Sequence, residues 1–117
     1  MGHVNHAVYF TYFEQCRLTC WRELTGTLHP HTRVIVAHAE CDYRSPATFG
    51  DELEVRMTVA EVGRSSFALA YAIVRAATEQ SVADGKTVMV GYDYEAARSI
   101  ALPDRTKELL NRLRRSP

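Results

Sequence analysis

The sequence has no excess of charge of either sign and no apolar run long enough to cross a bilayer. Its 14 basic residues balance its 14 acidic residues. This balance argues against broad binding to nucleic acid or to a membrane surface, because both need a basic excess. A small anion site is still compatible with it, since a few well-placed arginines suffice. We therefore expect neither nucleic acid nor membrane among the partners.

Cysteine is scarce and its number is odd, with Cys16, Cys20 and Cys41 in the whole chain. No secretory signal precedes them, and together these observations predict a reducing compartment and a cytoplasmic location. Cys16 and Cys20 share one helical face, where we interpret them as core residues rather than as a redox pair. At 117 residues the chain is expected to form one domain, residues 1–117, whose modest core would profit from a large interface with another copy.

Residues 5–24 are predicted to form one long helix. Asn5 suits the N-cap position and Gly26 suits a C-cap. Apolar residues recur between them at steps of three and four, and further aromatic residues widen this stripe. A helix that is apolar on several sides is expected to be surrounded by other elements. The stripe consists of Tyr9, Phe13, Cys16, Cys20 and Leu24.

After this helix the apolar period changes from that of a helix to the alternation of strands. The expected strands cover residues 33–44, 52–60, 67–76 and 87–94. In the first strand, Ile35 should share a face with Cys41, and the segment 83–86 is predicted to be a hairpin turn before the last strand. Pro103 opens a final short helix. The plan is therefore α+β, with a long helix wrapped by an antiparallel sheet.

Four sequence motifs, in order and at matching spacing, resemble the 4-hydroxybenzoyl-CoA thioesterase-like family. The resemblance covers nearly the whole chain and weakens after about Tyr94. It implies the hotdog fold, hydrolysis of an acyl-CoA thioester to a free acid and CoA, no cofactor apart from the CoA of the substrate, and a homodimer or homotetramer. The motifs are Gly2-His3-Val4-Asn5-His6-Ala7-Val8-Tyr9 with Tyr12-Phe13-Glu14 and Arg17, then Tyr43-Arg44-Ser45-Pro46-Ala47, Gly50-Asp51-Glu52-Leu53-Glu54-Val55, and Gly63-Arg64-Ser65-Ser66-Phe67.

Members of that family usually carry an aspartate three residues before the glycine that matches Gly2, where it activates water or attacks the thioester carbonyl. This position and the family's first strand would precede Met1. We expect that the coding start was placed at an internal methionine, with a natural or engineered truncation as the alternative. Without the aspartate, the chain as given is also compatible with a non-catalytic protein that binds acyl-CoA or an acyl carrier.

The start of the predicted helix is the candidate catalytic region. Its unpaired backbone N–H groups and positive dipole end favour an anion. By the resemblance, the amide of His6 would polarise the thioester carbonyl as an oxyanion hole does, while Asn5 caps the helix and Gly2 and His3 belong to the loop. A metal role for His3 and His6 is the weaker interpretation, because no third ligand follows at metal spacing. We expect no metal.

Glu14 is the fallback base if the aspartate is missing, because a related hotdog branch uses a helix carboxylate at about this depth. The simpler interpretation is an ion pair of Glu14 with Arg17 or Arg22, or with a partner subunit.

Tyr9 and the turn Arg64, Ser65 and Ser66 are the candidate substrate-binding residues. In the family this turn lies near the CoA phosphates, which a guanidinium and hydroxyls can bind. An ordinary hairpin turn explains the same residues equally well.

Overall fold

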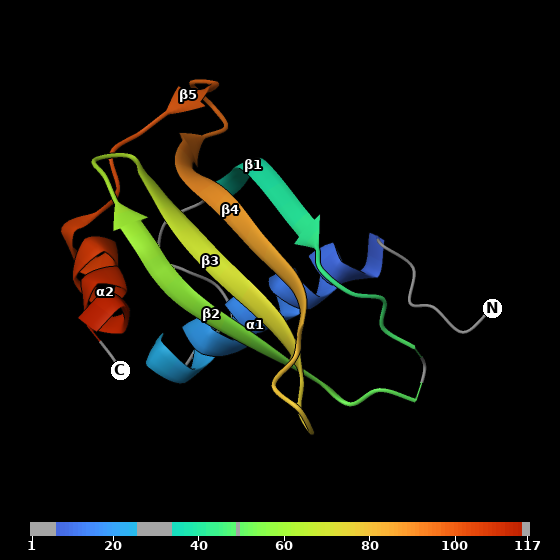
Figure 1. Ribbon diagram of the computed structural model, residues 1–117. Helices are drawn as coiled ribbons and strands as arrows, with labels where there is room; N and C mark the ends of the chain where they lie inside the picture. Colours follow the sequence, from blue (N-terminus) through green and yellow to red (C-terminus); the bar gives the residue numbers. More distant parts are fainter. Residues whose placement is uncertain (1–6, 26–33, 49, 116–117) are drawn as a thin grey trace.

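The computed structural model describes residues 7–25, 34–48 and 50–115 of the chain (Figure 1). A helix at the start is followed by the strands of one sheet and by a second helix, so the expected α+β order is confirmed. The elements are α1 (Ala7–Thr25), β1 (Val34–Tyr43), β2 (Leu53–Val62), β3 (Ser66–Arg75), β4 (Ser81–Asp93), β5 (Arg98–Ser99) and α2 (Asp104–Arg115).

The sheet is antiparallel throughout, with four long strands in the order β1-β4-β3-β2 and the short β5 paired with β4. The β4–β5 hairpin extends past one end of the sheet (Figure 1). The two helices predicted from residues 5–24 and from Pro103 are found as α1 and α2, and α2 has an acidic residue, Asp104, in its first turn. Neither helix of the described residues is long and apolar enough to span a membrane.

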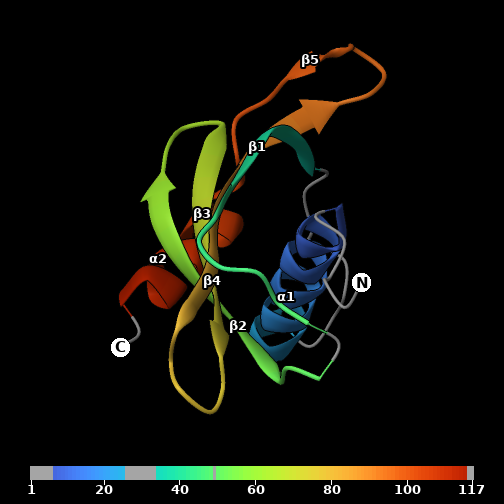
Figure 2. The same ribbon diagram turned by 45° about the vertical axis from the view of Figure 1, so that its right-hand side comes forward.

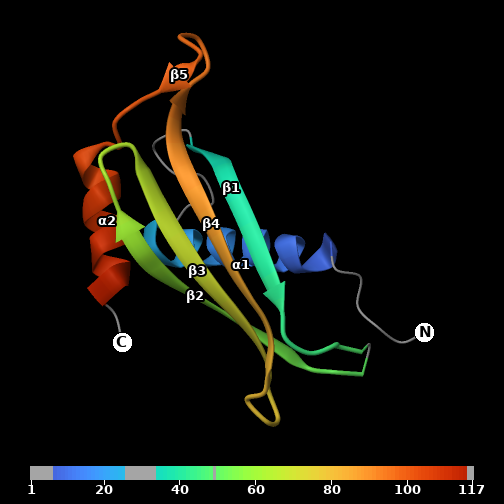
Figure 3. The ribbon, with the colours of Figure 1, turned by 45° about the horizontal axis from the view of Figure 1, so that its top comes forward.

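Both helices lie against the same face of the sheet, and α1 runs across the strands (Figures 2 and 3). The ring of Phe13 in α1 stacks on Tyr71 of β3 with 4.5 Å between centroids. At the other end of that face, Leu109 and Leu110 of α2 are buried against the sheet. The opposite face carries exposed charged side chains on β2, such as Glu54 and Arg56. The core therefore lies between one sheet face and two helices.

The hairpin turn predicted at residues 83–86 is wrong. The chain reverses at residues 76–80 instead, where Glu79 has a φ of 61° and its N–H donates to the Arg75 carbonyl at 2.8 Å. Gly85 lies inside β4 and pairs with Tyr71 on one side and Cys41 on the other. A Cβ at Gly85 would overlap the ring of Phe13. This glycine thus permits close approach of α1 and does not form a turn.

The alternation predicted for the first strand also fails in its first half. Val36 is opposite Met89, and His38 is opposite Val88, so Ala37 is an extra residue in the ladder. Such a bulge shifts the side-chain parity by one residue. Directly opposed residues share a face, and Val36 therefore shares the helix-covered face with Cys41. Ile35, expected on that face, is on the other one.

Candidate functional site

The first turns of α1 contact the end of β1 through aromatic rings. Tyr9 is 2% exposed, and its ring centroid lies 6.1 Å from that of Tyr12 and 5.6 Å from that of Tyr43. Burial raises the pKa of the Tyr9 hydroxyl, neighbouring Cys41 adds to this, and a hydrogen bond from the Ala47 backbone opposes it. Tyr9 therefore fixes the start of α1 against the segment after β1, and its ring is largely covered.

The segment between β1 and β2 is held by Arg75 at the end of β3. One guanidinium nitrogen, Nη1, donates to Ser45 Oγ at 3.1 Å and to Gln80 Oε1 at 2.8 Å, and Nη2 donates to the Pro46 carbonyl. The Nε atom pairs with Asp51 Oδ2 at 3.4 Å, and both side chains of this ion pair are about four-fifths buried, at 19% and 23% exposure. Two of the motifs are thus joined by one arginine.

Asp51 also closes its own loop. Its Oδ2 accepts the Thr48 N–H at 2.8 Å, and its N–H donates to the Thr48 carbonyl at 3.0 Å. The Thr48 N–H and, after it, the Arg75 guanidinium lower the pKa of the Asp51 carboxyl. A carboxyl with a lowered pKa stabilises the fold above its unfolded pKa, and this contribution is lost as pH falls through the folded value.

The predicted turn between β2 and β3 is present. The Gly63 N–H donates to the Ser66 carbonyl at 2.7 Å. The carbonyls of Arg64 and Ser65 accept N–H groups from Leu102 and Gly91, each at 2.9 Å. The Arg64 side chain is exposed. A groove of about 290 Å³ begins beside the turn, with Ser66 and Glu61 in its wall. These hydrogen bonds therefore hold the backbone of the turn, which carries the exposed Arg64 guanidinium.

In one copy of the chain this turn and the start of α1 lie at opposite ends of the sheet. Tyr43, beside Tyr9, pairs with Ala83 of β4, whereas Ser65 bonds to Gly91 of β4. At about 3.3 Å per residue, β4 runs about 26 Å between these two points. The structure does not bring the candidate residues of the turn and of the helix start together within one copy.

The remaining predicted residues have different outcomes. Gly2, His3, Asn5 and His6 lie outside the described residues. Glu14 is exposed on α1, and among the described residues it makes no ion pair, including none with Arg17. The side chain of Arg22 is not among those described. In the part of the chain that the structure covers, no three histidine, cysteine, aspartate or glutamate residues are grouped to hold a metal.

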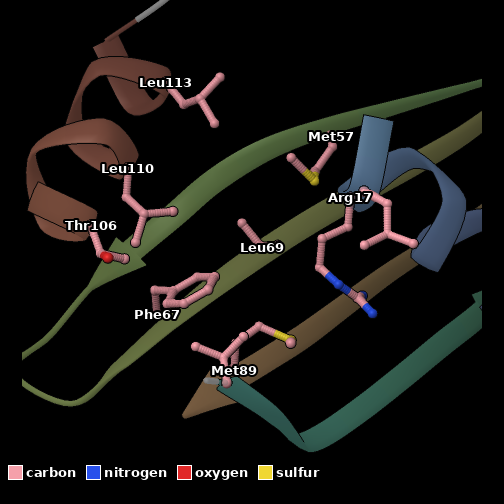
Figure 4. Close-up of a pocket in the computed structure, with 10 residues that line it drawn as sticks. Arg17, Met57, Phe67, Leu69, Met89, Thr106, Leu110 and Leu113 are labelled. Atoms are coloured by element: carbon pink, nitrogen blue, oxygen red, sulfur yellow. The ribbon is translucent and has the colours of Figure 1, made fainter. Parts of the chain in front are cut away.

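A cavity of about 70 Å³ lies between the two helices and the sheet (Figure 4). Its wall is almost entirely apolar, and Arg17 of α1 and Thr106 of α2 are the polar residues that line it. The Nη1 atom of Arg17 donates to the Tyr71 hydroxyl at 3.2 Å, and that hydroxyl shares a 2.8 Å hydrogen bond with Thr87. Apolar side chains in the wall include Met57, Phe67, Leu69, Met89, Leu110 and Leu113.

The family model described as Thioesterase-like superfamily matches residues 1–110. The chain belongs to this superfamily.

Individual proteins and solved structures are similar to this chain over most of its length. The uncharacterized protein YsmA of Bacillus subtilis is 30% identical over 110 residues, which are 93% of this chain and 74% of YsmA. A 1,4-dihydroxy-2-naphthoyl-CoA hydrolase of Synechococcus elongatus is 29% identical over 75 residues, 64% of this chain and 54% of the hydrolase. The crystal structure of a Thermus thermophilus thioesterase complexed with coenzyme A and Zn superposes with a TM-score of 0.83 at 30% identity, covering 99% of this chain and 85% of the other.

Sequence reasoning missed the cavity of this superfamily member. The sequence places Arg17 in the first motif and offers it as a partner for Glu14, and it assigns no role to Thr106. A signal for Thr106 exists, because Thr106, Leu109 and Leu113 recur at steps of three and four along one stripe of α2. A threonine in such a stripe is a polar group facing a core, which is a reason to ask what its hydroxyl contacts.

Proposed function

We propose that the chain is an acyl-CoA thioesterase of the 4-hydroxybenzoyl-CoA thioesterase-like type, with a hotdog fold in which the sheet wraps around α1. It would hydrolyse the thioester to a free acid and CoA. The observation that carries this proposal is the superposition on a thioesterase complexed with coenzyme A across 99% of this chain. The match to a CoA-ester hydrolase of Synechococcus elongatus supports it.

The chemistry would take place at the start of α1. The first N–H groups of a helix have no partner within the helix, and the dipole is positive there. The backbone amide of His6 and the N-terminal end of α1 would stabilise the oxyanion that forms when a water oxygen attacks the thioester carbonyl. A base takes the proton of that water, the C–S bond breaks, and the CoA thiolate takes up a proton. Tyr9 is the positioning residue that keeps this helix end in place.

We further propose that the substrate is shared between two copies. One copy separates its Arg64 turn from its own α1 start by about 26 Å of strand, so a second copy could supply the turn for the first. Strands β1 and β2 form the two edges of the described sheet, and such edges favour pairing with another chain. Static light scattering at micromolar concentration is expected to give the mass of a dimer or tetramer. A monomer mass would contradict the shared site.

A specific observation also favours a second candidate, a protein that binds acyl-CoA without cleaving it. Glu14, the fallback base, is exposed on α1 and makes no ion pair among the described residues. The release of free thiol from a panel of acyl-CoAs, followed with a chromogenic disulfide, distinguishes the two functions. Thiol release supports the enzyme, and CoA binding without thiol release supports the binding protein.

Replacing Arg64 by alanine is expected to raise the KM for acyl-CoA several-fold at low salt and to leave kcat nearly unchanged. A contact between the guanidinium and a CoA phosphate is equally strong in the ground and transition states, so its loss affects binding alone. The difference should shrink as salt rises, because an exposed ionic contact is screened. Arg114→Ala is the control, because Arg114 is an exposed arginine near the end of α2. Equal KM values for the two variants at low salt would show that the turn has no role in binding.

A further inference from the structure

The β4–β5 hairpin presents two aromatic rings at one end of the sheet. Tyr94, which follows β4, is 57% exposed, the highest value among the exposed large hydrophobic side chains of the described residues. Its ring contacts that of Tyr92 edge to face, with 5.2 Å between the centroids. Exposed aromatic side chains can stack on the base of a nucleotide, because every base has a flat π-face. The hairpin is therefore a candidate platform for a planar ligand.

The Arg64 turn is hydrogen-bonded to both sides of this hairpin. The Ser65 carbonyl accepts the N–H of Gly91 in β4, and the Arg64 carbonyl accepts the N–H of Leu102 after β5, each at 2.9 Å. The turn and the hairpin lie at the same end of the sheet (Figures 1 and 3). Tyr94 follows Gly91 by three residues, which is about 10 Å of extended chain. The exposed guanidinium and the exposed ring thus belong to one hydrogen-bonded unit of the same copy.

The charges of the hairpin distinguish what each part of this unit can bind. Asp93 and Glu95 flank Tyr94 in the sequence, and Arg98, which is opposite Asp93 in the ladder, offsets one of these two negative charges. Carboxylates repel phosphates, so the ring of Tyr94 suits an uncharged base better than a phosphate. The Arg64 guanidinium has the opposite preference, because its N–H fork matches phosphate oxygens.

We propose that the adenine ring of CoA stacks on Tyr94 while Arg64 of the same copy binds the CoA phosphates. This proposal rests on the acyl-CoA function proposed above. In CoA one ribose joins the adenine to the phosphates, so the two groups would be recognised at neighbouring points of the protein. Tyr92 is the positioning residue that supports the Tyr94 ring. The nucleotide end of the substrate is then held by one copy alone, even where a second copy supplies the thioester site.

Isothermal titration calorimetry of the full chain with CoA tests the stacking contact without any catalysis, because CoA has no thioester to cleave. Tyr94→Ala is expected to weaken CoA binding about five- to a hundredfold, the usual effect of losing one stacked base. Tyr94→Phe keeps the ring and should bind CoA nearly as tightly as the wild-type chain. The matched control ligand is 4′-phosphopantetheine, which lacks the adenosine, and Tyr94→Ala should leave its affinity unchanged.

Salt distinguishes the two contacts from each other. The loss of CoA affinity in Arg64→Ala should shrink as salt rises, because an exposed ionic contact is screened, whereas the loss in Tyr94→Ala should persist. Circular dichroism establishes that each variant is folded. Should Tyr94→Ala fail to fold, adenosine 3′,5′-bisphosphate and uridine 3′,5′-bisphosphate are compared on the wild-type chain. The adenosine compound is expected to bind several-fold more tightly, because a purine has the larger stacking surface.

The possible failures of the adenine site and of the proposed function differ. An unchanged CoA affinity in Tyr94→Ala, together with a weakened one in Arg64→Ala, would overturn the adenine site and leave the acyl-CoA function standing. Equal losses for CoA and 4′-phosphopantetheine in Tyr94→Ala, or equal affinities for the two bisphosphates, would also overturn the adenine site alone. A wild-type chain that does not bind CoA at millimolar concentration would overturn both.

Discussion

Gly85→Ala is expected to lower the free energy of unfolding by about 3 kcal/mol, and Gly85→Val is expected to prevent the native fold. A Cβ at this position would overlap the Phe13 ring and would lie 3.2 Å from the Glu40 carbonyl oxygen. The ring cannot move aside easily, since it is 1% exposed and stacked on Tyr71. Overpacking of this kind costs about 1–3 kcal/mol and occasionally more. Urea unfolding followed by circular dichroism measures the change.

The chain offers a matched control for this substitution. A Cβ at Gly50 would meet no atom within 4 Å, so Gly50→Ala should change the stability by less than about 0.5 kcal/mol. Phe13→Leu should reduce the penalty of Gly85→Ala, because the smaller side chain leaves room for the added methyl group. The interaction energy from this double-mutant cycle isolates the contact. Equal costs of Gly85→Ala in the presence and absence of Phe13 would show that α1 does not press on Gly85.

A chain lengthened at its N-terminus, with an aspartate three residues before Gly2, is expected to hydrolyse acyl-CoA with a kcat about 100- to 10,000-fold above that of the 117-residue chain. The KM should change little, because the Arg64 turn and the α1 start are present in both proteins. The aspartate would supply the base that removes the proton of the attacking water. Thiol release from several acyl-CoAs gives both constants, and the lengthened chain with asparagine in place of that aspartate is the control.

Glu14 provides the opposing outcome of this experiment. If the 117-residue chain is as active as the lengthened one, the upstream aspartate is not the base. Glu14→Gln in the short chain should then lower kcat by a similar factor, because glutamine keeps the size of the side chain but cannot accept the proton. Gln15→Ala is the neighbouring control, because Glu14 and Gln15 are both exposed on α1.

The order of elements could be predicted from the sequence, because it depends on local patterns. The apolar stripe through Tyr9 and Phe13 predicted α1 to within two residues at its start, and Pro103 predicted the start of α2. The alternation at residues 52–60 predicted β2 in the same way. These apolar patterns arise because one side of each element is buried, and both helices cover the same face of the sheet.

The two errors have tertiary causes. The glycine in 83–86 resembles a turn glycine locally, and only the position of Phe13 across the core explains why it lies inside β4. The bulge at Ala37 depends on pairing with β4 and leaves no local pattern. The cavity was missed for the same reason, because Arg17 and Thr106 are 89 residues apart in the sequence. Sites built from distant segments require the three-dimensional arrangement.

The cluster around Arg75 has a consequence for hydrogen exchange. Arg75 bonds to Ser45 and Pro46, which precede it by 30 and 29 residues, and also to Asp51. The segment after β1 cannot separate from the sheet without breaking these contacts together. Its amide protons, including those of Ser45 and Thr48, should therefore exchange through one shared opening rather than one by one. The loop beside the proposed active site thus behaves as a single cooperative unit.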